Sequence, residues 1–466
     1  MHNDSIDVND ELSDAPVGRM HIKLGILLAL MTLFDGYDTF NPAYVIHYVR
    51  GPWQLSLQQA GLLVSSGLVG FLFGAAIHGA IADRFGRRIT LIAGLWITTV
   101  FSVLTALAAD TFASFCTLRV LTGLGLGVLL PLATTYINEL APRRVENTFA
   151  LWGVALGWAA GGAAAGLVGV FLTPHTGWQG LYWIGSLSIL LIPFVHLYLP
   201  ESPKFALLRG RESEVRDILA KLRPERAHLY QTLSIRKPLV PEKAPVLALL
   251  AAPYRRLSIA IWLTSFLSLF CIFGLSGWIP TLMQARGESF GASFAFGALM
   301  QVMSFVGGLV CGRLVDRTGR PRFWLCMWWA AGALSVLALV FLQSHWVNLI
   351  CSAMAGFCII GGQFVLNNFT AASYETRMRA TAVGMELAVG RLGAILGPFI
   401  GGALQQMFGG TQAMLLAIVI AAGGAAMTVR FATRSAGCRF DSRGEADDVA
   451  TATGITSTNG LNQEVG

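Results

Sequence analysis

The feature that most constrains this chain is a series of long apolar stretches, each of 18 or more residues, separated by short charged clusters. Stretches of this length are long enough to cross the hydrocarbon core of a bilayer as helices. Charged residues make up only 13% of the chain, about half the roughly 25% that is typical of soluble proteins. The chain is therefore expected to be an all-α integral membrane protein.

Twelve spans are predicted, and they divide the chain into five segments. The spans are residues 22–46, 57–81, 89–109, 111–137, 147–171, 178–200, 257–280, 292–312, 322–343, 346–370, 380–404 and 411–432. The segments are a disordered tail (1–21), a six-helix bundle (22–200), a linker (201–256), a second six-helix bundle (257–432) and a second disordered tail (433–466). Arginines gather in the loops on one side, which places that side, both tails and the linker in the cytoplasm.

The chain also repeats itself. Residues 79–87 read GAIADRFGR, and residues 312–320 read GRLVDRTGR 233 positions later. The same offset pairs Gly157 with Gly390. Two six-helix halves joined by a charged segment are typical of secondary transporters, whose substrate site lies near the membrane midplane between the halves.

The repeated Gly-x3-Asp-Arg-x-Gly-Arg loop resembles the signature loop of the major facilitator superfamily. This resemblance implies two pseudo-symmetric six-helix bundles over residues 20–432. We interpret the loops as a cytoplasmic latch in which Arg84 and Arg87 pair with Glu139, while Arg317 and Arg320 pair with Glu375. The predicted latch residues are Gly79, Asp83, Arg84, Gly86, Arg87, Glu139, Asp316, Arg317, Arg320 and Glu375.

In this loop, Gly79 and Gly86 are expected to allow close packing and a tight turn. Simple anchoring of arginines on the cytoplasmic side is the alternative to a latch. It accounts for the arginines but not for the spacing of the aspartate and the glycines.

Five ionisable residues fall well inside predicted spans: Asp35, Asp38, Arg119, Glu386 and Arg391. None is duplicated at the repeat offset, so the scaffold does not require them, and intramembrane charges are functional by default. Asp35 and Asp38 share one helix face. Two neighbouring carboxylates in low dielectric resist ionising together, so this pair can hold a proton near neutral pH. Glu386 and Arg391 lie roughly 140° apart around their helix and should not form a simple pair.

The Asp35-Gly-x-Asp38 segment resembles the aromatic acid–proton symporter family, as do the glycine run after Arg119 and the Gly-Arg391-Leu-Gly segment. This resemblance implies import of benzoate-, hydroxybenzoate- or phenylpropanoate-like anions with protons. It gives the coupling role to Asp35 and Asp38, and substrate or coupling roles to Arg119 and Arg391. Glu386 departs from the family pattern, and a further carboxylate there could serve a cation or another proton. We therefore include it among the proton-coupling candidates.

The substrate-binding candidates also follow from side-chain chemistry. An arginine fork matches the two oxygens of a carboxylate. Tyr37 and Phe40 offer ring surface for stacking, and Gln363 and Asn367 can bind a hydroxyl or a carbonyl. The alternatives are that the aromatic residues face lipid or core, that the amides bond across helices, and that the charges form internal salt bridges.

The leading hypothesis is a proton-driven importer of small aromatic carboxylates. A porter for sugars or other organic ions, and a membrane sensor with a transporter fold, stay open. The sequence has no catalytic, nucleotide-binding or metal-binding motif, so we expect neither an enzyme nor a cofactor. A basic folded face for nucleic acid is also missing. We expect a monomer in the bacterial inner (plasma) membrane, with both termini in the cytoplasm.

Overall fold

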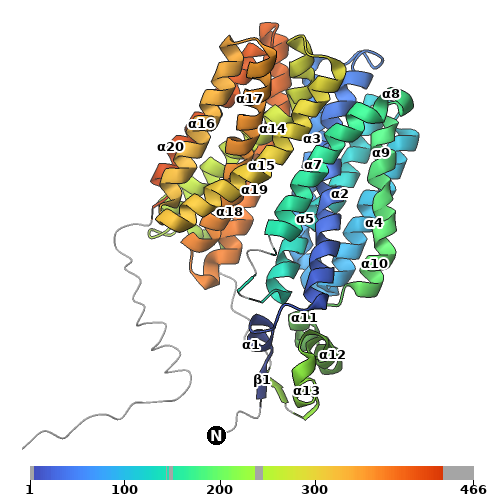
Figure 1. Ribbon diagram of the computed structural model, residues 1–466, viewed down its shortest axis with the longest axis vertical. Coiled ribbons are helices and arrows are strands. Elements are labelled where there is room, and N and C mark those ends of the chain that lie inside the picture. Colours follow the sequence, from blue (N-terminus) through green and yellow to red (C-terminus); the bar gives the residue numbers. More distant parts are fainter. Residues whose placement is uncertain are drawn as a thin grey trace, which may run out of the picture.

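The computed structural model describes residues 5–142, 144–145, 149, 151–232, 234–236 and 245–433. The predicted tail beyond residue 433 lies outside this part. Twelve helices in it are long and apolar enough to cross a membrane, as predicted. They form two bundles that stand side by side (Figure 1).

The first bundle holds the first six spans. Its elements are α2 (Arg19–Val49), α3 (Leu57–Phe85), α4 (Arg87–Ala108), α5 (Phe112–Leu140), η1 (Leu151–Ala155) with α7 (Leu156–Phe171), α8 (Thr173–Thr176), and α9 (Gln179–Ser186) continued by η2 (Leu187–Leu190) and α10 (Leu191–Tyr198). The fifth span thus begins with a π-helical segment, η1, and the sixth contains a 3-10 segment, η2.

The second bundle holds the other six. Its elements are α14 (Arg255–Ala285), α15 (Phe290–Thr318), α16 (Pro321–Phe341), α17 (His345–Ala355) continued by η5 (Gly356–Ile360) and α18 (Gly361–Ser373), α19 (Thr376–Phe408), and α20 (Gln412–Thr428) with η6 (Val429–Phe431). The segment between the bundles contains α11 (Pro203–Leu208), α12 (Glu212–Leu222), η3 (Pro224–Arg226), α13 (Leu229–Thr232), β2 (Ser234–Arg236) and η4 (Val246–Leu250).

The internal repeat is visible in the packing of the two bundles. A Cβ built on Gly74 of α3 would lie 2.2 Å from the carbonyl oxygen of Leu124 on α5. A Cβ on Gly307 of α15 would lie 1.9 Å from the carbonyl oxygen of Phe357 in η5. Both residues of the second pair lie 233 positions after those of the first. The same helix crossing therefore occurs in each half, and in both it leaves room only for glycine.

Hydrogen bonds join the two bundles at one end. We call the end with the loops near residues 86 and 319 the basic end, and the end with the loops near residues 51, 287 and 410 the opposite end. At the opposite end, His47 Nδ1 lies 2.8 Å from Gln284 Oε1, and the backbone N–H of Gln58 donates to Gln406 Oε1 at 3.2 Å. The α3–α19 and α7–α15 pairs form most of the interface.

Residues 5–13, before the first span, form two ordered elements, which corrects the prediction of a disordered tail for this part. Strand β1 (Ser5–Asp7) pairs in parallel with β2, and helix α1 (Val8–Ser13) follows it. Glu11 on α1 is buried and accepts hydrogen bonds from Arg223 at 2.8 Å, Arg226 at 2.6 Å and Tyr230 at 2.8 Å. Partners more than 200 positions away stabilise this segment, so its own short sequence carries no signal for order.

Candidate functional site

The five predicted intramembrane charges are all buried. Asp35, Asp38 and Glu386 are 0% exposed, Arg119 1% and Arg391 8%. They lie on α2, α5 and α19, so both bundles contribute. Burial of ionisable groups in a membrane span is costly unless partners, a ligand or a proton compensate for it. The partners of each group therefore decide what it can do.

Asp38 and Arg119 belong to a cluster inside the first bundle. Arg119 Nη2 donates to the backbone carbonyl of Asp38 at 2.7 Å, and its guanidinium lies 5.5 Å from the ring centre of Tyr182. The Asp38 carboxylate accepts a hydrogen bond from Ser102 at 3.2 Å. Within the described residues, Nε and Nη1 of Arg119 have no hydrogen-bond partner. The cluster is thus largely internal to one bundle, and two guanidinium nitrogens have no partner in the described part of the chain.

Tyr37 belongs with this internal layer and not with the interface. Its hydroxyl donates to the backbone carbonyl of Leu181 on α9 at 3.0 Å. A tyrosine held in this way has its polar end fixed inside the first bundle. The role predicted for Tyr37 in substrate binding stays a prediction.

Asp35 faces the boundary between the bundles. Neither of its carboxylate oxygens has a hydrogen-bond partner within the described residues, and the same is true of the indole nitrogen of Trp158. The charge of Arg391 acts on Asp35. Asp35 is therefore a buried carboxylate whose main compensation comes from a cation on the other bundle.

Arg391 reaches from α19 to the first bundle. Its guanidinium lies 3.7 Å from the ring centre of Phe71 on α3 and 5.8 Å from that of Phe273 on α14. In the part of the chain that the structure describes, it forms no hydrogen bond and no ion pair. Its charge acts on both Asp35 and Glu386. A cation held by ring faces keeps its N–H donors available for a ligand.

Aromatic rings from both bundles surround this position. Phe40 on α2 stacks on Phe273 with ring centres 6.0 Å apart and an angle of 11° between the rings. Phe40 also meets Trp158 edge-on at 4.9 Å, and Trp158 meets Phe364 on α18 at 6.2 Å. Of these rings, only Phe40 was predicted. Trp158 could have been found from the repeat, because it lies 233 positions before Arg391.

Glu386 organises the polar side of the site. Its Oε1 accepts hydrogen bonds from Ser265 at 2.8 Å and from Gln363 at 3.0 Å. The Gln363 amide also donates to Asn367 Oδ1 at 2.9 Å. The second carboxylate oxygen of Glu386 has no partner within the described residues. Gln363 and Asn367 are therefore close together, and Glu386 binds Gln363. Their predicted role in substrate binding stays a prediction.

One predicted latch contact of the first bundle is present: Arg87 pairs with Glu139 at 3.5 Å, and it also pairs with Asp83 at 3.0 Å. The predicted pair of Arg84 with Glu139 is not found among the described residues. Glu201 was missed by the prediction: its Oε1 accepts the backbone N–H of Arg87 at 2.8 Å, where the first turn of α4 favours a negative charge. Gly86 has a φ of 104°, which confirms the predicted turn.

Two further details of the predicted latch are wrong. A Cβ at Gly79 would meet nothing within 4 Å, so this glycine is not needed for close packing. Glu375 accepts a hydrogen bond from the Tyr254 hydroxyl, and among the described residues it forms no ion pair with Arg317 or Arg320. Glu375 is the N-cap residue of α19, and this position brings it beside the chain that enters α14. The role predicted for Asp316 stays a prediction.

Among the described residues, no group of three or more His, Cys, Asp or Glu side chains could hold a metal ion.

Comparison with known proteins decides the family. Residues 26–327 and, in a second match, 293–456 fit the sequence profile of the Major Facilitator Superfamily. The chain belongs to this superfamily.

Characterised relatives of this superfamily member are transporters. The gallate transporter of Pseudomonas putida is 32% identical, over 91% of this chain and 94% of its own length. The 4-hydroxybenzoate transporter PcaK of Pseudomonas aeruginosa is 30% identical, over 90% of this chain and 93% of its own. These relatives confirm the predicted resemblance to the aromatic acid family. The chain is a multi-pass membrane transport protein and not an enzyme.

A solved structure shares the fold of this transporter. The xylose transporter XylE from E. coli, in a partially occluded inward-open conformation, matches with a TM-score of 0.71 at 17% identity. The match covers 91% of this chain and 100% of that one. It confirms the predicted fold of two six-helix bundles.

Proposed function

We propose that this transporter imports small aromatic carboxylates together with protons by alternating access. The observation that carries the proposal is the position of Arg391, a buried guanidinium with free donors among aromatic rings from both bundles. The relatives named for gallate and 4-hydroxybenzoate support the same cargo class.

The substrate is held by complementary groups in this proposal. The Arg391 fork binds the carboxylate through two parallel hydrogen bonds. Phe40, Phe273 and Trp158 stack on the ring, since offset and edge-on aromatic contacts are favourable. Hydroxyl groups on the substrate ring contact the polar side chains around Glu386. Because these residues come from both bundles, the substrate contacts both halves and can follow their relative movement.

Proton coupling follows from competition for one cation. Without substrate, Arg391 compensates the charge of Asp35. When a substrate carboxylate takes over the guanidinium, Asp35 loses this compensation, and an uncompensated buried carboxylate is costly, so it takes up a proton. Binding of the anion and of the proton therefore favour each other, and by linkage the effect is reciprocal. Asp38 and Arg119, inside the first bundle, relay this change, and Glu386 offers a further carboxylate.

The orientation belongs to the same proposal. The basic end lies in the cytoplasm with both termini, because its arginines follow the positive-inside rule. The transporter acts as a monomer in the inner membrane. The Arg87 contacts fix the α3–α4 loop against α5 while the bundles move.

The test is uptake of labelled 4-hydroxybenzoate by proteoliposomes with an imposed proton gradient. We expect Asp35→Asn to abolish accumulation against a gradient while exchange of internal for external substrate continues. Asp110→Asn makes the same chemical change at an exposed loop residue and should behave as wild type. Accumulation by the Asp35→Asn protein at the wild-type level, or uptake insensitive to an uncoupler, would refute the coupling mechanism.

A further inference from the structure

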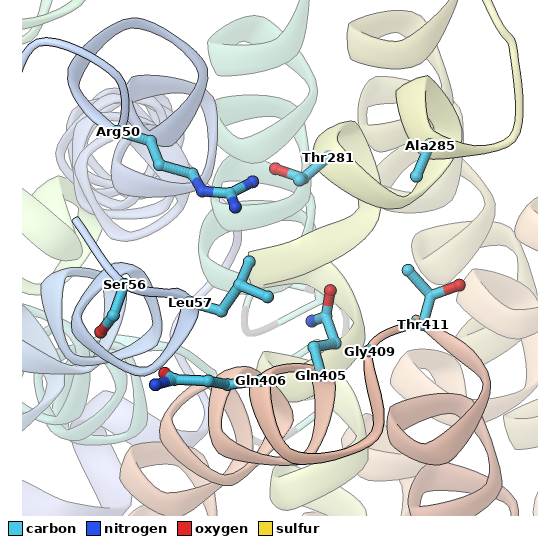
Figure 2. A pocket seen from close by; sticks show the side chains of 10 residues that line it. Arg50, Ser56, Leu57, Thr281, Ala285, Gln405, Gln406, Gly409 and Thr411 are labelled. Atoms are coloured by element: carbon cyan, nitrogen blue, oxygen red, sulfur yellow. The ribbon is translucent and has the colours of Figure 1, made fainter. Parts of the chain in front are cut away.

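A pocket lies at the opposite end, far along the helices from Asp35 and Arg391. Its volume is about 460 Å³, within the range of small-molecule sites. Figure 2 shows the side chains that line it. The lining residues are Arg50, Ser56, Leu57, Thr281, Ala285, Gln405, Gln406, Gly409, Gly410 and Thr411.

The pocket exists only when the bundles meet at this end. One wall comes from the end of α2 and the start of α3, and the other from α14 and the α19–α20 turn. Beside it the bundles are in direct contact: a Cβ on Gly402 would lie 2.3 Å from the carbonyl oxygen of Leu57. Gln406, which lines the pocket, also accepts the hydrogen bond from Gln58 that joins the bundles.

The chemistry of the pocket favours an anion. Arg286, in another loop of this end, is fully engaged: it donates to Asn348 Oδ1 at 2.7 Å and to the Leu339 carbonyl at 2.6 Å. Arg50 has neither a hydrogen bond nor an ion pair from its side chain within the described ranges. Figure 2 shows its guanidinium directed across the pocket toward Thr281. A free guanidinium facing hydroxyl and amide groups suits a carboxylate.

The loop behind Arg50 is held in an unusual conformation. Gln54 has a φ of 51°, and no other non-glycine residue in the described part of the chain has a positive φ. The Leu55 N–H donates to the Arg50 carbonyl at 2.9 Å and closes the loop over this strained residue. Such strain persists only where the surroundings enforce it, and it concentrates at binding sites.

We propose that this pocket binds a small carboxylate and that an occupied pocket holds the opposite end closed. A ligand that touches both walls binds only the closed arrangement, so it shifts the transport cycle toward that state. At ten times its dissociation constant, the shift is about eleven-fold. Excess carboxylate on this side would therefore slow transport through a site separate from the central one.

Equilibrium binding of labelled benzoate to the purified full-length chain tests the site. Five proteins are compared: wild type, Arg391→Gln, Arg50→Gln, the Arg391→Gln/Arg50→Gln double variant and Arg391→Gln/Arg50→Lys, each checked for folding by gel filtration and circular dichroism. We expect Arg391→Gln to retain a binding site that the double variant lacks, and Arg50→Lys in the Arg391→Gln background to restore part of it. Equal binding by the single Arg391→Gln and double variants, or none by Arg391→Gln, would overturn the proposal.

Uptake into proteoliposomes tests the effect on the cycle. The ratio of the uptake rate in excess benzoate to that in dilute benzoate should be several-fold higher for Arg50→Gln than for wild type. An unchanged ratio overturns the claim that the pocket holds the gate closed. A wild-type protein that transports neither benzoate nor 4-hydroxybenzoate would refute the proposed cargo, and the binding comparison would then decide the pocket by itself.

Discussion

Replacing Arg391 by glutamine tests the central site directly. Glutamine keeps most of the length and the hydrogen-bonding capacity of the side chain but removes the charge and the planar fork. The guanidinium of Arg391 is held by the faces of Phe71 and Phe273 and has no partner of its own among the described residues. Within the described residues the substitution breaks no direct ion pair, but it also removes the charge that compensates Asp35. Its effect on substrate therefore combines the loss of the ligand contact with the loss of this compensation.

The size of the effect follows from the lost contact. A hydrogen bond to a charged group is worth about 1.5–3 kcal/mol, which corresponds to a loss of about 10- to 160-fold in affinity. Arg391→Lys keeps the charge but lacks the fork, so its loss should be smaller. The cation–π contact with Phe71 contributes on the order of 2 kcal/mol when it is desolvated, so the glutamine variant should also unfold at a lower temperature.

The assay is competition of unlabelled 4-hydroxybenzoate against the labelled acid for the purified protein, with benzamide as a neutral analogue. Wild type should prefer the acid strongly over the amide, and Arg391→Gln should lose most of this preference. Arg119→Gln, inside the first bundle, should change the preference less. If the glutamine variant binds the acid with wild-type affinity, Arg391 does not bind the substrate carboxylate and the proposed site is wrong.

Three further predictions concern the scaffold. A Cβ on Gly36 would lie 2.1 Å from a carbonyl oxygen of α7, so Gly36→Ala should cost about 1–3 kcal/mol of stability and lower the unfolding temperature, whereas Gly384→Ala, with open space around it, should not. Glu11→Gln removes the charge that two arginines bind, so hydrogen exchange in residues 5–13 should become faster. Burial raises the pKa of Glu288, but hydrogen bonds led by that from Asn348 outweigh it and lower the pKa below 4.5. The stabilisation from Glu288 is therefore present above pH 4.5 and is lost as the pH falls through the lowered pKa of this group. In that pH range, hydrogen exchange in residues 286–289 should become faster in wild type, and the increase should be smaller in Asn348→Ala.

The sequence predicted the architecture because its signals are strong at that level. Long apolar stretches and a repeat at a fixed offset leave few folds open, and Gly74 and Gly307 show the repeat at the level of single contacts. The buried charged residues could also be identified from the sequence, because an ionisable residue in an apolar span is rare. Arg391 is the clearest example.

The directions in which these side chains point could not be predicted from the sequence. The first span is apolar on most sides, so its sequence does not fix the rotation of the helix, and Tyr37 turned into the first bundle while Phe40 reached the interface. The rings of Phe273 and Phe364 lie among many other aromatic residues in spans, and nothing local marks them. The order of residues 5–13 depends on Arg223 and its neighbours, which only the folded chain brings close.

Trp158 and Arg391 occupy corresponding places in the two copies of the repeat, yet one carries an indole and the other a guanidinium. A chain built from two equal halves has no inherent front or back for a ligand. Under the proposed function, this mismatch gives a bound acid its polarity, with the carboxylate toward one copy and the ring edge toward the other. We expect that exchanging the two residues would reverse the orientation of the bound acid.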